Sequence, residues 1–270
     1  MKKKIKQILF KYNLGNILYY KKNLSHLFLD EDLSNQDKEI VICGMPRLGS
    51  TLVYNLVKEI HGFDQKFIYV KDNNEYIKAV RKGYKLIKCH SNLPIIKKRV
   101  SSNKAIGIFT HRNLLDIAIS FVQKKRNTIE EIIEQQIIQN ISYKALDLAK
   151  VKNMVLISYE DEISSVENLI HKILKTFGSN IENDKVSQIA EKYSRHKVNK
   201  IGENVISITD AKKKFKLNAI SGFHENHFFD GKSDKYINLL DTSTIKILAN
   251  QTKDFNAFFS YDILIKNSHE

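Results

Sequence analysis

The chain has 270 residues, of which 42% are hydrophobic, enough for one large α/β domain and short for two equal ones. With 44 Lys and Arg against 30 Asp and Glu, the formal net charge is +14, so the protein should attract anionic small molecules, polyanions or an acidic membrane surface. The two cysteines lack disulfide-framework or metal-ligand spacing, and the apolar runs are too short for a signal-peptide core or a membrane span. These features argue against a disulfide-stapled secreted domain and favour a cytoplasmic protein with reduced thiols.

We expect a single domain over residues 1–270 that begins with a helical N-terminal extension, residues 1–37. Residues 1–22 are basic and open with MKKKIK. A first helix packed on the core and peripheral contact with a membrane surface both fit this segment. The other lysines are dispersed along the predicted helices, which is typical of a solvated surface and disfavours a dedicated nucleic-acid-binding face.

Five short apolar runs rich in β-branched residues predict strands, and their continuity predicts a sheet that is buried on both faces. The runs are 39–44, 67–70, 85–90, 105–111 and 153–159. Between them, apolar residues at helical spacing predict helices at 50–62, 114–126, 128–151 and 164–178. This alternation predicts a three-layer α/β/α fold with a central, mostly parallel sheet over residues 38–180. The remainder, 181–270, is expected to be mainly helical, with helices at 184–197, 208–215 and 241–259.

The connection between the first strand and the first helix, Gly44 to Thr51, reads GMPRLGST. A phosphate-binding P-loop has the form G-x-x-x-x-G-K-[ST], and this stretch keeps both glycines and the threonine but has Ser50 in place of the lysine. The glycines permit a tight turn in which backbone N–H groups and the helix N-terminus face an anion. Arg47, inside the turn, can supply positive charge. An ordinary glycine-rich connection is the alternative interpretation.

The missing lysine argues against an enzyme that hydrolyses ATP or GTP, because that side chain reaches the β- and γ-phosphates. The stretch PRLGSTL resembles the 5′-phosphosulfate-binding loop of the sulfotransferases that use 3′-phosphoadenosine-5′-phosphosulfate (PAPS). The resemblance implies a P-loop-like fold with 38–180 as the nucleotide-binding core, PAPS as sulfuryl donor and no metal. It also implies that the donor is bound by Pro46, Arg47, Leu48, Gly49, Ser50, Thr51 and Leu52.

Further stretches resemble the same family and follow in the family's order. The sequence KCH, with Lys88 and His90, is similar to a K-T-H strand end whose histidine is the general base in many members. In IFTHRNLLDIAISFVQ, Arg112 and Ser120 match the arginine and the serine, eight residues apart, that hold the 3′-phosphate. The alternative for Arg112 is a surface salt bridge with Asp116, four residues on.

Two more matches extend the resemblance to roughly residues 38–262. VLISYED is similar to the strand that places a tyrosine, here Tyr159, at the adenine. HENHFFDGKSDKYINLL is similar to the C-terminal segment of bacterial members, which implies that Gly231 lies in a phosphate-binding loop and that Lys232 supplies charge there. The acceptor pocket has no readable signature, and a glycan or a small metabolite are the candidates.

The chemistry of sulfuryl transfer fits these residues. An imidazole at position 90 suits removal of a hydroxyl proton, and the rate should then fall as the pH drops through about 6.5 unless Lys88 and Arg47 lower the histidine pKa. Lys88 and Arg47 can stabilise charge on the transferring group, and the planar fork of Arg112 suits a phosphate dianion. Because some members use a glutamate as the base, Glu75 in VKDNNEY is the second candidate.

Two other classes of function stay open. A nucleotide or nucleoside kinase shares the strand-loop-helix start but should carry the P-loop lysine and a carboxylate for magnesium. A basic nucleic-acid-binding protein should show clustered basic residues interleaved with exposed aromatic ones.

Overall fold

The computed structural model describes residues 38–124, 126–163, 165–194, 196–198, 218, 220–223 and 233–264. In this part of the chain five strands form one sheet, and every neighbouring pair of strands is parallel. Its order is β2-β3-β1-β4-β5, so the predicted parallel sheet is confirmed. The strands are β1 (Glu39–Cys43), β2 (Tyr69–Val70), β3 (Leu86–Cys89), β4 (Ala105–His111) and β5 (Met154–Ser158).

Helices follow each strand in the sequence. They are α3 (Ser50–Ile60), α4 (Asn73–Arg81), α5 (Pro94–Ser101), α6 (Leu114–Gln123), α7 (Ile129–Glu134), α8 (Ile137–Ala149), α9 (Val166–Phe177), α10 (Asn183–Lys192), α12 (Tyr236–Leu239), α13 (Thr242–Gln251) and α14 (Lys253–Phe259). One π-helical segment, η2 (Tyr159–Ile163), follows β5. Within the described parts of the chain, no helix has both the length and the apolar composition that a bilayer crossing needs.

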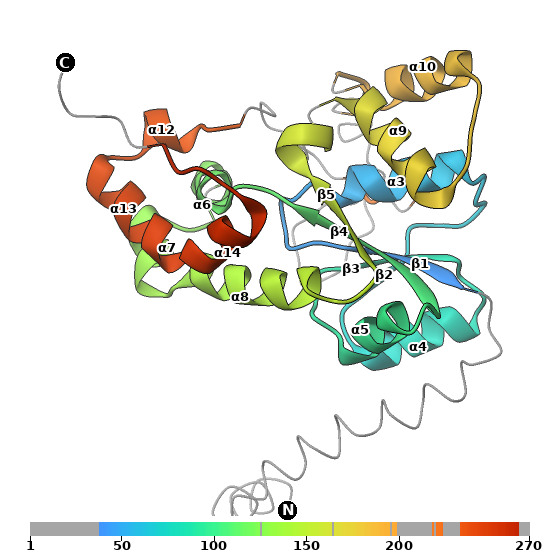
Figure 1. Ribbon diagram of the computed structural model, residues 1–270, viewed down its shortest axis with the longest axis horizontal. Coiled ribbons are helices and arrows are strands. Elements are labelled where there is room, and N and C mark those ends of the chain that lie inside the picture. The colour runs from blue at the N-terminus through green and yellow to red at the C-terminus, as the bar shows by residue number, and fades with distance from the viewer. Residues whose placement is uncertain are drawn as a thin grey trace, which may run out of the picture.

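The sheet is covered on both faces, as its continuous apolar strands predict. Along β1, Ile40 and Ile42 pack with α3, α9 and α10, whereas Val41 and Cys43 pack with α4, α5, α6, α8 and the C-terminal helices. Figure 1 shows these two groups of helices on opposite sides of the sheet. The predicted three-layer α/β/α architecture is therefore confirmed.

Two long helices expected from the sequence are each divided in the structure. The segment 128–151 forms α7 and α8, because Gln136 adopts a left-handed conformation with φ 51° and ends the first helix. The segment 241–259 forms α13 and α14, with a break at Thr252, whose hydroxyl donates to Leu248 O at 2.9 Å. The expected helix at 208–215 lies outside the described residues.

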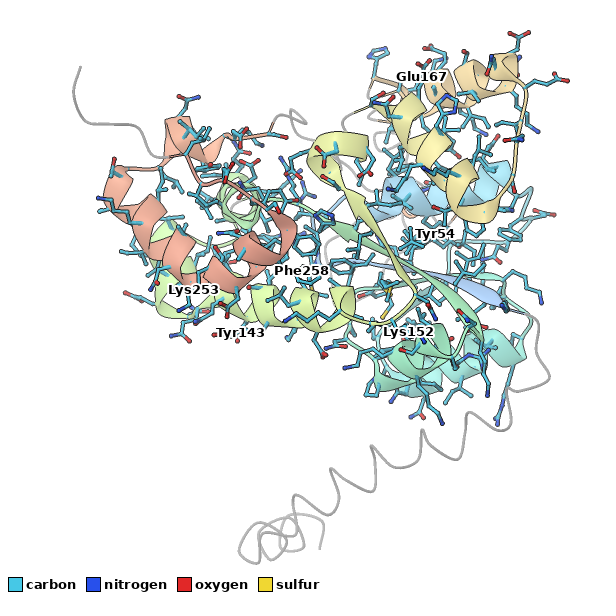
Figure 2. The ribbon with its side chains drawn as sticks, viewed as in Figure 1. Tyr54, Tyr143, Lys152, Glu167, Lys253 and Phe258 are labelled. Atoms are coloured by element: carbon cyan, nitrogen blue, oxygen red, sulfur yellow. The ribbon has the colours of Figure 1, made fainter. Side chains whose placement is uncertain are left out.

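The C-terminal helices extend the layer that contains α8. Figure 1 shows α13 and α14 beside α7 and α8, far along the chain from them. Figure 2 shows Phe258 of α14 near α8, and its ring centroid is 5.8 Å from Lys150 Nζ at the end of that helix. On the other side of the sheet, Tyr54 of α3 (Figure 2) is fully buried. Its hydroxyl accepts the N–H of Ile68 at 3.2 Å. This bond fixes α3 to the segment that enters β2.

A buried ion pair fastens the start of β1 to two helices that the sequence analysis did not predict. Glu39 accepts two hydrogen bonds from Arg99 of α5, each at 2.9 Å, and one from the hydroxyl of Tyr76 of α4. All three side chains are almost fully buried. Burial alone would lower the pKa of Arg99, but its hydrogen bonds and charge pairing with Glu39 raise it. Two charges buried in this way are tolerated because each satisfies the other.

Candidate active site

The site lies where β1, β3 and β4 end, in the middle of the sheet. β1 runs between β3 and β4, and the connections from β1 and from β3 leave toward opposite edges of the sheet. Parallel α/β sheets bind ligands in the crevice at such a switch point, beyond the carboxyl ends of the strands. The segments after these three strands carry the GMPRLGST loop, His90 and Arg112.

The loop after β1 has the backbone of a tight anion-binding turn. Arg47 and Gly49 both have positive φ, 75° and 79°, and Gly49 is the N-cap of α3. A Cβ on Gly44 would collide with Thr110 Oγ1, and a Cβ on Gly49 would lie 2.7 Å from Ile163 Cδ1. Gly44 is therefore favoured by the close approach of β4, and Gly49 chiefly by its positive φ. The turn places the N-terminus of α3, with its free N–H groups, at the carboxyl ends of the strands.

Lys88 supplies an ammonium group to this turn from the neighbouring strand. Its Nζ donates to Thr51 Oγ1 in the first turn of α3. The side chain is only 4% exposed, and burial lowers its pKa to about 7. Lys88 thus reaches the hydroxyl beside the position where a P-loop would carry its own lysine.

His90 is fixed in one tautomer by the same loop. Its Nδ1 is hydrogen-bonded to Gly44 O. Because a carbonyl oxygen can only accept, the ring hydrogen is on Nδ1 and Nε2 keeps its lone pair. Burial, and secondarily the charge of Lys88, lower the pKa of His90 to about 3, so the ring is neutral near pH 7. The Tyr69 ring lies beside it, with the centroids 5.4 Å apart.

Arg47 joins the loop to α6. Its Nε donates to Ser120 Oγ at 2.9 Å. Burial, then the charges of Arg126 and Arg112, lower its pKa to about 10. Burial and the charges of Arg47 and Arg126 also lower the pKa of Lys124 to about 8. Mutual repulsion among these four cations indicates a site built to receive an anion.

Arg112 lies between Tyr159 and Asp116. Its guanidinium carbon is 4.0 Å from the Tyr159 ring centroid, and its Nη2 is 3.4 Å from Asp116 Oδ2. The salt bridge considered from the sequence therefore exists, but it is not on the surface, because Arg112 is 6% exposed and Asp116 is fully buried. Tyr159 is the first residue of η2, and its ring also packs against Gly49. One face of the tyrosine is thus occupied by the arginine.

Comparison with known proteins gives structural matches only. No protein-family model matches the chain, and no curated protein matches it. Mouse sulfotransferase SULT7A1 complexed with PAP (adenosine 3′,5′-bisphosphate) has a TM-score of 0.60 and 16% identity, over 89% of this chain and 90% of that one. Retinol dehydratase in a complex with retinol and PAP has a TM-score of 0.58 and 14% identity, over 83% of each chain.

The chain has the sulfotransferase fold. The motifs that resemble this family, from the GMPRLGST loop to Arg112, lie together at the carboxyl ends of the central strands β3, β1 and β4. Within the loop, the side chains of Leu48 and Leu52 are buried in the two apolar layers, so only their backbone groups can face a ligand. Ser50 and Thr51 are also buried, at 3% exposure each, and Pro46 is partly exposed.

One expected site residue, Glu75, lies on the surface. Glu75, the second candidate for the base, is exposed in the first turn of α4, and its carboxylate accepts the N–H of Lys71 at 2.8 Å. No contact found among the described residues joins Glu75 to His90. Gly231 and Lys232 lie outside the described residues. In the described segments, no group of three His, Cys, Asp or Glu side chains is placed to hold a metal ion.

Two buried carboxylates and two cations of the site have contacts that were not expected from the sequence. Glu160 accepts the N–H of Asn113 at 3.0 Å and the hydroxyl of Tyr261 at 2.8 Å, and burial raises its pKa. Asp116 binds backbone groups of the C-terminal segment. No local pattern points to either contact. Lys124 and Arg126 had a visible signal, because the run KKR ends the helix predicted at 114–126.

Proposed function

We propose that the protein transfers a sulfuryl group from PAPS to a hydroxyl group of an acceptor. The observation that carries this proposal is the contact between Lys88 and Thr51, made beside a P-loop-like turn that has no lysine of its own. In nucleotide-hydrolysing P-loop proteins the equivalent hydroxyl holds magnesium. Here an ammonium group binds that hydroxyl, which disfavours the kinase alternative. The shared fold of two structures in complex with PAP supports the same donor.

The transfer needs a base, a leaving group and charge stabilisation. The acceptor oxygen forms a bond to sulfur while the bond between sulfur and the bridging oxygen breaks, and PAP departs with the electron pair. His90 Nε2 takes the acceptor proton, since Nδ1 is held by Gly44 O. Lys88 and Arg47 stabilise the negative charge that grows on the leaving phosphate, aided by N–H groups of the loop.

The rest of the donor extends toward α6. Arg112 and Ser120 hold the 3′-phosphate, and Tyr159 lies at the adenine. Lys124 and Arg126 add positive charge on the same side, since the charge of Arg126 lowers the pKa of Arg47 and the charge of Arg47 lowers the pKa of Lys124. We assign Gly231 and Lys232 to the same phosphate from the sequence resemblance alone. The acceptor class is left to experiment, with glycans and small metabolites as the first pools to test.

Ligand-induced stabilisation tests the donor directly. PAP at about one hundred times its dissociation constant should stabilise the folded protein by about 2.7 kcal/mol, because a ligand that binds only the folded state shifts the unfolding equilibrium. Thermal unfolding should show this shift equally with added magnesium and with a chelator. ATP is the matched control and should produce a smaller shift. Stabilisation by ATP alone, or by PAP only when magnesium is present, would contradict the proposal.

Deprotonation of Lys88 should determine the decrease of kcat/KM at alkaline pH. Its pKa in the free protein is lowered to about 7, so the cationic form is present below pH 7 and is lost above it. The base form of His90 is present across the neutral range because its pKa is lowered to about 3. The rate constant should therefore fall above pH 7 and should not fall at 6.5, where an unshifted histidine would titrate. Measuring kcat/KM from pH 5 to 9 checks this, and a profile that declines on the acid side near 6.5 would refute it.

A further inference from the structure

The buried carboxylate of Asp116 makes contacts that the proposed chemistry does not use. Asp116 lies in the first turn of α6 and is fully buried. Oδ1 accepts the N–H of Lys235 at 2.8 Å and that of Tyr236 at 3.4 Å. Oδ2 accepts the N–H of Asp234 at 2.9 Å and faces Arg112 Nη2 at 3.4 Å. All four of these partners are donors, so both oxygens are needed as acceptors.

These contacts join two parts of the chain that are 118 to 120 residues apart. The C-terminal part turns sharply at Asp234, which has φ 57°, and enters the short helix α12. Its N–H groups at the turn would be unsatisfied without an acceptor. A carboxylate accepts stronger hydrogen bonds than a neutral group does. Because this carboxylate is buried, the loss of any of its hydrogen bonds would destabilise the folded protein. The turn is therefore fixed to the carboxylate that also contacts Arg112.

We infer that Asp116 is a positioning residue for the 3′-phosphate subsite, which holds the guanidinium of Arg112 and the backbone of residues 234–236 in a fixed relation. This inference rests on the proposed function. Recognition of the 3′-phosphate then depends on docking of the C-terminal segment, whose preceding residues include Gly231 and Lys232. A purely structural cap would behave differently, because its loss would weaken every nucleotide alike.

The Asp116→Asn variant separates these roles, since an amide offers one acceptor and one donor where four donors converge. Losing hydrogen bonds to a charged group should weaken binding of adenosine 3′,5′-bisphosphate by about 10- to 100-fold. Binding of adenosine 5′-phosphate, which lacks the 3′-phosphate, should change by less than about threefold. Isothermal titration calorimetry with both nucleotides measures the two constants. Asp241→Asn is the matched control, because Asp241 caps α13 through Thr244 N at 2.8 Å, and both constants should stay at the parental values.

The outcomes are distinct. If the parent protein does not bind the bisphosphate, the proposed function fails. If the parent binds the bisphosphate, two results for Asp116→Asn would show that the positioning role is wrong. One is parental affinity for both nucleotides, and the other is an equal loss of affinity for both. If the variant does not fold, hydrogen exchange of the parent decides the question. The bisphosphate should then slow exchange of the amides of residues 234–236 at least several-fold more than adenosine 5′-phosphate at equal saturation, and equal protection would overturn the inference.

Discussion

Replacing His90 with alanine should lower turnover by about two to four orders of magnitude, which is the usual contribution of a general base. The ring is neutral near pH 7, and its bond to Gly44 O leaves Nε2 as the proton acceptor. Nucleotide affinity should change little by comparison, because in the proposed reaction the base acts on the acceptor. The measurement is sulfuryl transfer from labelled PAPS to an acceptor found by screening glycan and metabolite pools.

Two further variants make that result specific. His90→Asn keeps a side-chain N–H that can donate to Gly44 O but removes the base, so its turnover should be as low as that of His90→Ala. A large recovery in the asparagine variant would mean that His90 acts only by holding the loop. Glu75→Gln should retain turnover, since Glu75 is exposed and bound to Lys71 N. Loss of turnover in Glu75→Gln with full activity in His90→Ala would transfer the role of base to Glu75.

The second large effect concerns the buried ion pair at the start of β1. Glu39→Ala should lower the free energy of unfolding by about 3–5 kcal/mol, because it leaves Arg99 charged and buried without that partner. Denaturant unfolding measures this loss. Lys97→Ala is the control, since its pair with Asp147 is on the surface and should contribute about 1 kcal/mol or less.

A double variant identifies the origin of the cost. Replacing both partners with apolar residues, Glu39→Leu with Arg99→Met, should restore much of the lost stability, because neither charge of this buried pair then remains. A double variant that is as unstable as Glu39→Ala would show that the hydrogen bonds to Tyr76 and the shape of the cluster matter more than the charge.

The strands and the loop were predictable because their signals are local. Five continuous apolar runs indicated a sheet covered on both faces. The two glycines of GMPRLGST indicated a tight turn. Lys88, His90 and Arg112 stand at strand ends, so a parallel sheet necessarily brings them to one edge. The roles of these side chains in catalysis and binding still stand as predictions.

Other features depend on contacts between distant segments. The helix α4 comes from a polar stretch, and its position depends on the cap by Asp72 and on Tyr76, which is buried against Glu39. The sequence around Gln136 contains no glycine or proline that would predict a helix end there. Tertiary packing overrides the local preference for one long helix. The same holds for Asp116, because an aspartate four residues after an arginine resembles a surface pair until its partners at 234–236 are known.

β1 begins at the ion pair between Glu39 and Arg99 and leads at its other end into the turn at Gly44. Its five residues separate the ion pair at Glu39 from the turn at Gly44 by about 16 Å at the usual rise per residue of a strand. Groups that far apart with no shared partner contribute independently to free energy. Directed evolution of the proposed acceptor specificity can therefore begin from a parent stabilised around Arg99. The added tolerance to destabilising loop substitutions would then leave the turn at Gly44 unaltered.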